Sequence, residues 1–168
     1  MTVIALIVSA ILVVIDQIIK IAIVNNMELY ETISVIKFGN KEVFNLTYVI
    51  NDGAGWSILS GKTVFLVSFT SILMIAIIIY LVKFAERKPL LISALSCIIG
   101  GGIGNLVDRI FRDGKVVDFI DAKFIDFPVF NFADICVTVG VALLIIQIIK
   151  SEFYNRKSIS IESEKIDE

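Results

Sequence analysis

Two aspartates, Asp118 and Asp134, are the residues of this chain best suited to acid–base chemistry. Each lies among apolar residues, close to a segment long enough to enter a membrane. Two carboxylates that share a site cannot easily both ionise, so one proton is held between them and one pKa rises. One member can then activate a water molecule while the other protonates a carbonyl oxygen. We predict that Asp118 and Asp134 form a catalytic pair at a membrane surface.

Further polar residues are spaced to surround this pair. Asn105, Asp108 and Arg109 stand at i, i+3 and i+4, so they share one face of a helix. We expect them to orient the catalytic groups, although Asp108 and Arg109 also fit a simple ion pair at the interface. Asn131 and Asp134 are again three residues apart. Helix capping is an alternative for Asn131 and a weaker account of Asp134.

Asp16 and Lys20 lie one helical turn apart inside the first apolar segment. One interpretation is an ion pair near the outer end of a helix, with Lys20 extending towards the interface. The other is that the two residues brace the active-site side of a helix bundle. Both stay open, because a charged residue inside a membrane is costly enough to suggest a function.

The residues between the first two apolar segments have a strand-like pattern. Val43–Ile50 is rich in residues that favour strands, and the turn Asn51–Ser57 follows it with the letters N-D-G-A-G-W-S. An N-D-G turn alone is ordinary hairpin chemistry. The small residues around Gly53 and Gly55 favour an edge on which an extended peptide lies, and Trp56 suits the lipid headgroup level. We expect a small sheet on the outer surface.

Composition predicts a membrane protein, since 57% of the residues are hydrophobic and only 19% are charged. About 20 apolar residues are needed to cross a bilayer. Four segments reach that length: residues 3–24, 63–82, 90–107 and 129–149. We therefore expect an all-α bundle of four membrane helices with a small extracytoplasmic sheet. Residues 1–150 form one membrane domain, and residues 151–168 form a solvated, disordered tail.

The distribution of basic residues predicts the orientation of these helices. Residues 83–89 and 150–168 together contain seven Lys or Arg in 26 positions, whereas residues 25–62 and 108–128 contain seven in 59. Basic residues are enriched in cytoplasmic loops. Both termini are therefore expected in the cytoplasm, with the aspartate pair at the outer face.

Several classes of function are disfavoured by what the sequence lacks. There is no histidine, which removes Ser-His and Cys-His catalysis and His-ligated metals from consideration. Cys97 and Cys136 fall within the third and fourth apolar segments and read as small core residues. A net charge of −2 without a basic patch does not suggest nucleic-acid binding. We expect no metal and no cofactor.

Five motifs in this order resemble those of the lipoprotein signal peptidases, also called signal peptidase II. Each motif is weak alone, but together they cover residues 3 to about 150. They are D-Q-x-x-K at Asp16–Lys20, N-D-G-A-G-W-S at Asn51–Ser57, G-G-G-I-G-N-L-V-D-R at Gly100–Arg109, V-V-D-F at Val116–Phe119 and F-N-F-A-D at Phe130–Asp134.

The resemblance implies a bacterial cytoplasmic-membrane aspartyl endopeptidase with four spans, an outer β-cradle and an interfacial loop or helix along the membrane. Its substrates would be prolipoproteins, cleaved on the amino side of a diacylglyceryl-modified cysteine, and we expect a monomer in contact with membrane lipid. Asp118 and Asp134 match the catalytic pair. Positions that line or brace the substrate site are matched by Asp16, Lys20, Asn51, Gly53, Asn105, Asp108, Arg109 and Asn131. Gly102 and Phe132 depart from the usual residues, which affects packing rather than polar groups.

Two other classes of membrane protein use intramembrane carboxylates. In a proton-coupled transporter, Asp16, Lys20, Asp108 and Asp134 would line a path. The second apolar segment, however, is uncharged, and the polar groups gather at one face. Presenilin-like proteases carry a G-x-G-D signature, and here the third letter of G-I-G is followed by Asn105 instead.

Overall fold

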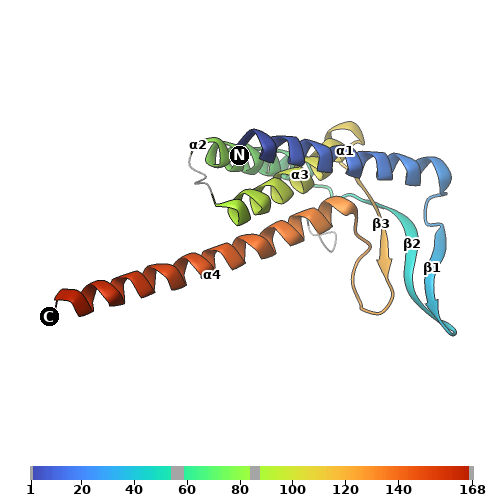
Figure 1. Ribbon diagram of the computed structural model, residues 1–168. Coiled ribbons are helices and arrows are strands. Elements are labelled where there is room, and N and C mark those ends of the chain that lie inside the picture. The colour runs from blue at the N-terminus through green and yellow to red at the C-terminus, as the bar shows by residue number, and fades with distance from the viewer. Residues whose placement is uncertain (1, 54–58, 84–87, 167–168) are drawn as a thin grey trace.

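The protein is a bundle of four long helices with a small sheet at one end, as Figure 1 shows for a computed structural model. The structure describes residues 2–53, 59–83 and 88–166. In chain order the elements are α1 (Thr2–Asn26), β1 (Thr32–Phe38), β2 (Lys41–Asn51), α2 (Thr63–Lys83), α3 (Pro89–Phe111), β3 (Val116–Ala122) and α4 (Phe132–Ile166). Both ends of the chain lie away from the sheet (Figure 1).

All four helices are long and apolar enough to span a membrane, which confirms the predicted fold of four membrane helices. Helix α3 is the central one. In its most apolar stretch of 18 residues 56% are buried, against 17% in the same stretch of each of the other three helices. The others expose rows of Ile, Val, Leu and Phe, as expected where a helix faces lipid. The shape is thus a bundle assembled around α3.

Glycines let α3 approach its neighbours closely. A Cβ added at Gly101 would collide with the backbone carbonyl of Ala133 in α4, and one at Gly104 would lie 2.8 Å from the Asp16 carboxylate and 3.2 Å from the Ala133 Cβ. Small residues at such positions allow helices to pack backbone to backbone. These glycines hold α1, α3 and α4 close together at the level where the polar residues lie.

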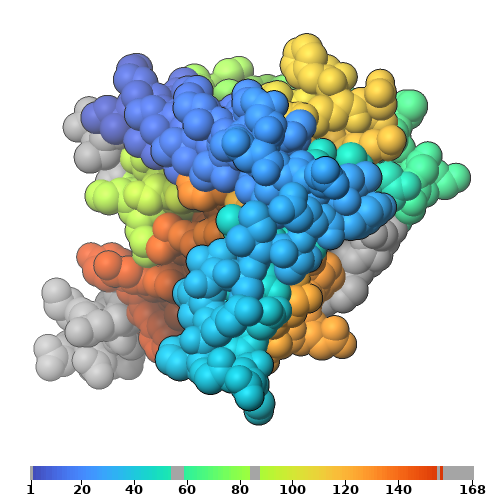
Figure 2. Space-filling view, turned by 90° about the vertical axis from the view of Figure 1, so that its right-hand side faces the viewer, coloured from blue at the N-terminus to red at the C-terminus, as the bar shows by residue number. Residues whose placement is uncertain are grey.

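The sheet is antiparallel with strand order β1-β2-β3, so β2 is its centre. A hydrophobic cluster joins the sheet to the bundle. In it, Ile23 and Met27 at the end of α1 pack with Tyr48, Val117 and Phe119. Figure 2 looks onto this end and shows the β1–β2 hairpin lying across it. The predicted small sheet is therefore present, and it packs onto one end of the helices.

The fourth helix differs from expectation at both ends. It begins at Phe132 rather than 129, because Phe130 is still paired with Ile120 of β3. It continues to Ile166, whereas we expected a disordered tail from residue 151. Residues 151–166 contain no glycine or proline to stop a helix.

Two expected features, the end of the N-D-G-A-G-W-S turn and an interfacial helix, are not among the described elements. Ala54, Gly55, Trp56 and Ser57 of the N-D-G-A-G-W-S turn lie outside the described residues. An interfacial helix is not among the elements of the described residues.

Candidate active site

Asp118 lies in the middle of β3, opposite Val49 of β2, and its side chain is only 3% exposed. The strand is paired on one edge with β2 and carries buried side chains along nearly its whole length. Two amides meet the carboxylate: Asn51 Nδ2 donates to Oδ2 at 3.0 Å, and Asn131 Nδ2 donates to Oδ1 at 2.6 Å. The sheet and the start of α4 thus hold this carboxylate from both sides.

Asp134 lies in the first turn of α4 and forms a capping box with Asn131. The Asn131 Oδ1 accepts from the Asp134 N–H at 3.0 Å, and the Asp134 Oδ2 accepts from the Asn131 N–H at 3.1 Å. We had considered helix capping the less suitable role for Asp134. This was wrong, because its Oδ2 is part of the capping box. The other oxygen, Oδ1, accepts from Asn105 Nδ2 at 2.8 Å. One carboxylate therefore begins the helix and faces the site.

Burial and the neighbouring charge of Asp134 raise the pKa of Asp118 from its ordinary 3.8 to about 7. Burial is the larger cause, because it removes water that would stabilise the ionised carboxylate. The amides of Asn51 and Asn131 act in the opposite direction. A carboxyl group that is partly protonated at neutral pH is suited to acid–base catalysis.

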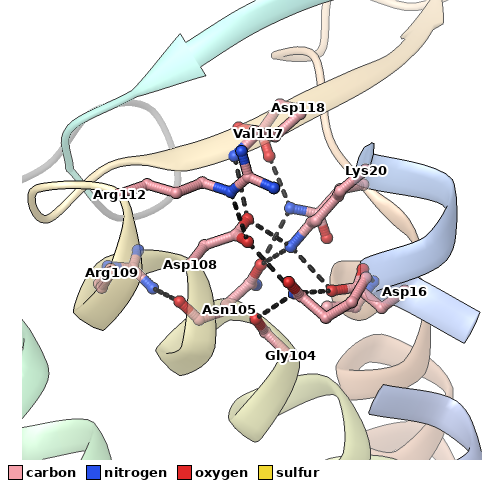
Figure 3. Close-up of polar contacts among 12 residues, drawn as sticks. Asp16, Lys20, Gly104, Asn105, Asp108, Arg109, Arg112, Val117 and Asp118 are labelled. Atoms are coloured by element: carbon pink, nitrogen blue, oxygen red, sulfur yellow. Dashed lines mark hydrogen bonds and ion pairs between the residues drawn. The ribbon is translucent and has the colours of Figure 1, made fainter. Parts of the chain in front are cut away.

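A buried ionic network that includes Asp16, Lys20 and Asp108 lies below Asp118 in the view of Figure 3. Lys20 Nζ lies 2.9 Å from Asp16 Oδ2, 2.8 Å from Asp108 Oδ2 and 3.0 Å from Asn105 Oδ1. Lys20 is 0% exposed, so it does not extend to the interface as one of our interpretations had it. Asn105 accepts from Lys20 and donates to Asp134, which connects the network to the aspartate pair.

The network also fixes backbone segments on two elements, β3 and α4. Asp16 Oδ1 accepts from the Ala133 N–H at 3.0 Å, satisfying one of the free donors in the first turn of α4. Asp108 Oδ2 accepts from the Val117 N–H at 3.1 Å, next to Asp118 in β3. The charged residues of α1 and α3 thereby set the positions of both aspartates.

Arg109 and Gly53 connect the network to the N-D-G turn. Arg109 Nη2 donates to the Gly53 carbonyl at 2.8 Å, and the Gly53 N–H donates to Asn51 Oδ1 at 2.9 Å. Arg109 does not pair with Asp108, which instead contacts Arg112 Nε at 3.2 Å. The Arg109 Nε is buried and lacks a hydrogen-bond partner among the described residues.

Every predicted site residue is joined to the others by hydrogen bonds or ion pairs. Three polar residues of this region were not singled out as site residues. Gln17 donates to Asp108 Oδ1 and to the Gly104 carbonyl, and Arg112 pairs with Asp108. Asp121 of β3 is only 4% exposed and accepts a hydrogen bond from Thr47 Oγ1. Gln17 could have been identified from the sequence, because it is a polar residue within an apolar segment.

A cavity of about 600 Å³ opens beside the aspartate pair. Asp118, Asp134, Asn51, Asn105 and Arg109 lie at its polar end. Its remaining walls come mainly from the apolar faces of α2 and α4, with Gly102 of α3 between them. The cavity therefore joins a pair of carboxylates to an apolar groove between membrane helices.

Solved structures share this arrangement. One bacterial membrane enzyme, solved at 2.3 Å resolution, matches with a TM-score of 0.81 and 36% sequence identity over 88% of each chain. A second, solved at 1.9 Å, matches with a TM-score of 0.77 and 36% identity over 87% of this chain and 92% of its own. Fold and site together define a multi-pass membrane enzyme.

Residues 8–150 match the family model described as signal peptidase (SPase) II. A lipoprotein signal peptidase of Brevibacillus brevis is 38% identical over 149 residues, which are 89% of this chain and 97% of that protein. One of Staphylococcus aureus is 37% identical over 148 residues, or 87% and 88%. The chain belongs to the signal peptidase II family and is a peptidase, which disfavours the transporter alternative.

Proposed function

We propose that this protein is an aspartyl endopeptidase that removes signal peptides from diacylglyceryl-modified prolipoproteins, on the amino side of the lipidated cysteine. The observation that carries the proposal is the shared environment of Asp118 and Asp134. Both carboxylates meet Asn131, and both lie at the polar end of one cavity. The chain's membership in the signal peptidase II family supports the substrate class.

Asp118 holds the proton of the pair, because its pKa is raised to about 7. Asp134 takes a proton from a water molecule, whose oxygen attacks the carbonyl carbon of the scissile bond. The proton of Asp118 passes to the carbonyl oxygen, giving a tetrahedral diol. When the carbon–nitrogen bond breaks, the proton on Asp134 passes to the leaving amine. Asp118 regains its proton from the diol hydroxyl, so the pair returns to its starting state.

The remaining polar residues position this pair and the substrate. Asn51 and Asn131 fix the plane of the Asp118 carboxylate, and Asn105 fixes that of Asp134. Arg109 lines the cavity and donates to the Gly53 carbonyl, so it holds the N-D-G turn beside the aspartate pair. Asp16, Lys20 and Asp108 act through Asn105 and through backbone bonds, as positioning residues.

The apolar part of the cavity binds the signal peptide. Its walls, α2 and α4, are membrane helices, so a substrate anchored in the bilayer enters sideways from the lipid. The scissile bond then lies at the membrane surface beside the sheet. The distribution of basic residues supports an orientation with both termini in the cytoplasm and the site at the outer face of a bacterial cytoplasmic membrane. The site is complete within one chain, which suits a monomer.

A gel-shift cleavage assay tests this function. Purified protein in detergent is given one prolipoprotein in two forms, with and without the diacylglyceryl group. We expect cleavage of the lipidated form only, with the modified cysteine as the new amino-terminal residue, and no cleavage by Asp134→Asn. Equal cleavage of both forms, or a cut elsewhere, contradicts the proposal.

A further inference from the structure

A second cavity, of about 290 Å³, lies on the other side of Asp134. Its walls are almost entirely apolar. Aromatic rings form one side, with Phe44 of β2 against Phe124 at a centroid distance of 5.3 Å. Ile135 and Val139 of α4 form the other side. In Figure 2 the segment that follows β3 lies beside the β1–β2 hairpin.

The two cavities share a wall that contains Asp134. Phe127, Phe130 and Thr138 also line both, and the rings of Phe127 and Phe130 pack edge to face with centroids 5.6 Å apart. Beyond this wall, the first cavity is lined by residues of α2. The second is lined by Phe44 of β2 and by Ile135 and Val139 of α4. Two apolar spaces therefore converge on one carboxylate.

The second cavity is too small for a peptide helix, which with its side chains is about 10–12 Å across. A single hydrocarbon chain fits a space of this size. Ile135, Thr138 and Val139 lie at i, i+3 and i+4, so the groove runs along α4 in the direction of the membrane interior. Ile135 is 39% exposed and Val139 is 45% exposed, so this side is accessible from the lipid.

We propose that this second cavity binds an acyl chain of the substrate's diacylglyceryl group. The inference rests on the proposed function and extends it. The cleaved bond lies between a signal peptide and a lipidated cysteine, so the two apolar parts of the substrate leave the scissile carbonyl in different directions. Asp134 stands where the two cavities meet, which places the peptide in the first and the lipid in the second.

A kinetic test fills the second cavity with Val139→Trp. Lipopeptide substrates carry either short or long acyl chains. For the wild type we expect KM to fall as the chains lengthen. In Val139→Trp the KM for the long-chain substrate rises by about tenfold, and kcat stays within about twofold of the wild type. The dependence of KM on chain length is largely lost.

The control is Ile146→Trp, two turns further along α4 and 52% exposed, which lines neither cavity. It should keep the chain-length dependence of the wild type. An unchanged dependence in Val139→Trp overturns the inference while leaving the proposed function intact. If the wild type cleaves no lipidated substrate, the proposed function fails and the inference fails with it.

A binding test does not depend on how Val139→Trp folds. Asp118→Asn is mixed with a lipopeptide that carries a photoreactive group in one acyl chain, and labelled residues are located by mass spectrometry. We expect label on Phe124, Ile135 and Val139. Label confined to α2 overturns the inference. Equal labelling of these residues by a photoreactive phospholipid, undiminished by lipopeptide, shows a site for bilayer lipid and also overturns it.

Discussion

The side-chain amide of Asn131 donates a 2.6 Å hydrogen bond to Asp118, from the residue that caps α4 to the middle of β3. The same asparagine exchanges two hydrogen bonds with Asp134. A single residue thereby ties the two predicted catalytic carboxylates together. The separation of the pair depends on where α4 begins.

Replacing either aspartate by asparagine is expected to abolish cleavage. Asp118→Asn and Asp134→Asn each remove a carboxylate that holds or moves a proton, so kcat should fall by at least about 10³-fold. The matched control is Asp121→Asn, on the same strand but paired with Lys123 and Thr47 outside the site. It should keep activity within about threefold of the wild type. Near-normal turnover by either of the first two variants refutes the assignment of the pair.

The pH dependence of kcat/KM should report the proton on Asp118. If the protonated form is required, kcat/KM falls as pH rises through about 7, the pKa of Asp118 in the folded protein. A rise in kcat/KM through the same range contradicts the role of Asp118 as the acid. Initial rates on a fixed lipopeptide between mildly acid and mildly alkaline pH decide between these outcomes.

Stability should depend on pH for the same reason. The pKa of Asp118 is raised on folding from 3.8 to about 7, so the folded protein binds this proton more tightly than the unfolded chain. The free energy of unfolding should therefore decrease as pH rises from about 4 to about 7, by up to roughly 4 kcal/mol. Asp118→Asn should remove most of this decrease. Thermal unfolding in detergent across that range measures it, and equal pH dependence in both proteins is the contrary result.

Lys20→Met should destabilise the fold. The change leaves the Asp16 and Asp108 carboxylates buried without their cation, which costs about 3–5 kcal/mol. Lys37→Met is the control, because Lys37 pairs with Glu42 on an exposed strand, where an ion pair contributes at most about 1 kcal/mol. Denaturation in mixed micelles compares the two. Similar losses in both variants argue against a dominant role for the ionic network.

Gly101→Ala tests whether helix contact sets the geometry of the site. The added Cβ meets the backbone carbonyl of Ala133, so α3 and α4 must separate at a cost of about 1–3 kcal/mol. Asn105 and Asp134 lie on these two helices, and we expect kcat to fall by about tenfold or more. Wild-type kcat in a folded Gly101→Ala protein disproves this coupling.

The sequence predicted the helices well, because apolar segments of membrane length have few alternatives. It also indicated the site residues, since polar groups in apolar segments are costly. The partners that these polar side chains contact were harder to predict. An ion pair between Asp108 and Arg109 was one alternative, but Asp108 pairs with Lys20 of α1 and with Arg112. Which partner a charged side chain meets depends on how the helices pack, and spacing within one helix does not specify this.

Two other differences have local causes. Capping of α4 by Asn131 and Asp134 follows from the residue at which that helix begins, and the length of an apolar segment does not specify that residue. The burial of Asp121 follows from strand pairing, which brings Thr47 of β2 to its carboxylate. A charged residue in a short polar loop gives no sign of such a partner.

Asp16 and Lys20 form their 2.9 Å ion pair within a single turn of α1. This helix precedes α3 in the chain, so during synthesis it emerges long before Asp108 exists. Because the pair is local, α1 carries its own counter-ion and enters the bilayer with these two charges already neutralised. When α3 packs against α1, Lys20 keeps Asp16 and gains Asp108 as a second partner. The residues that support the candidate site thus also make α1 acceptable to the lipid on its own.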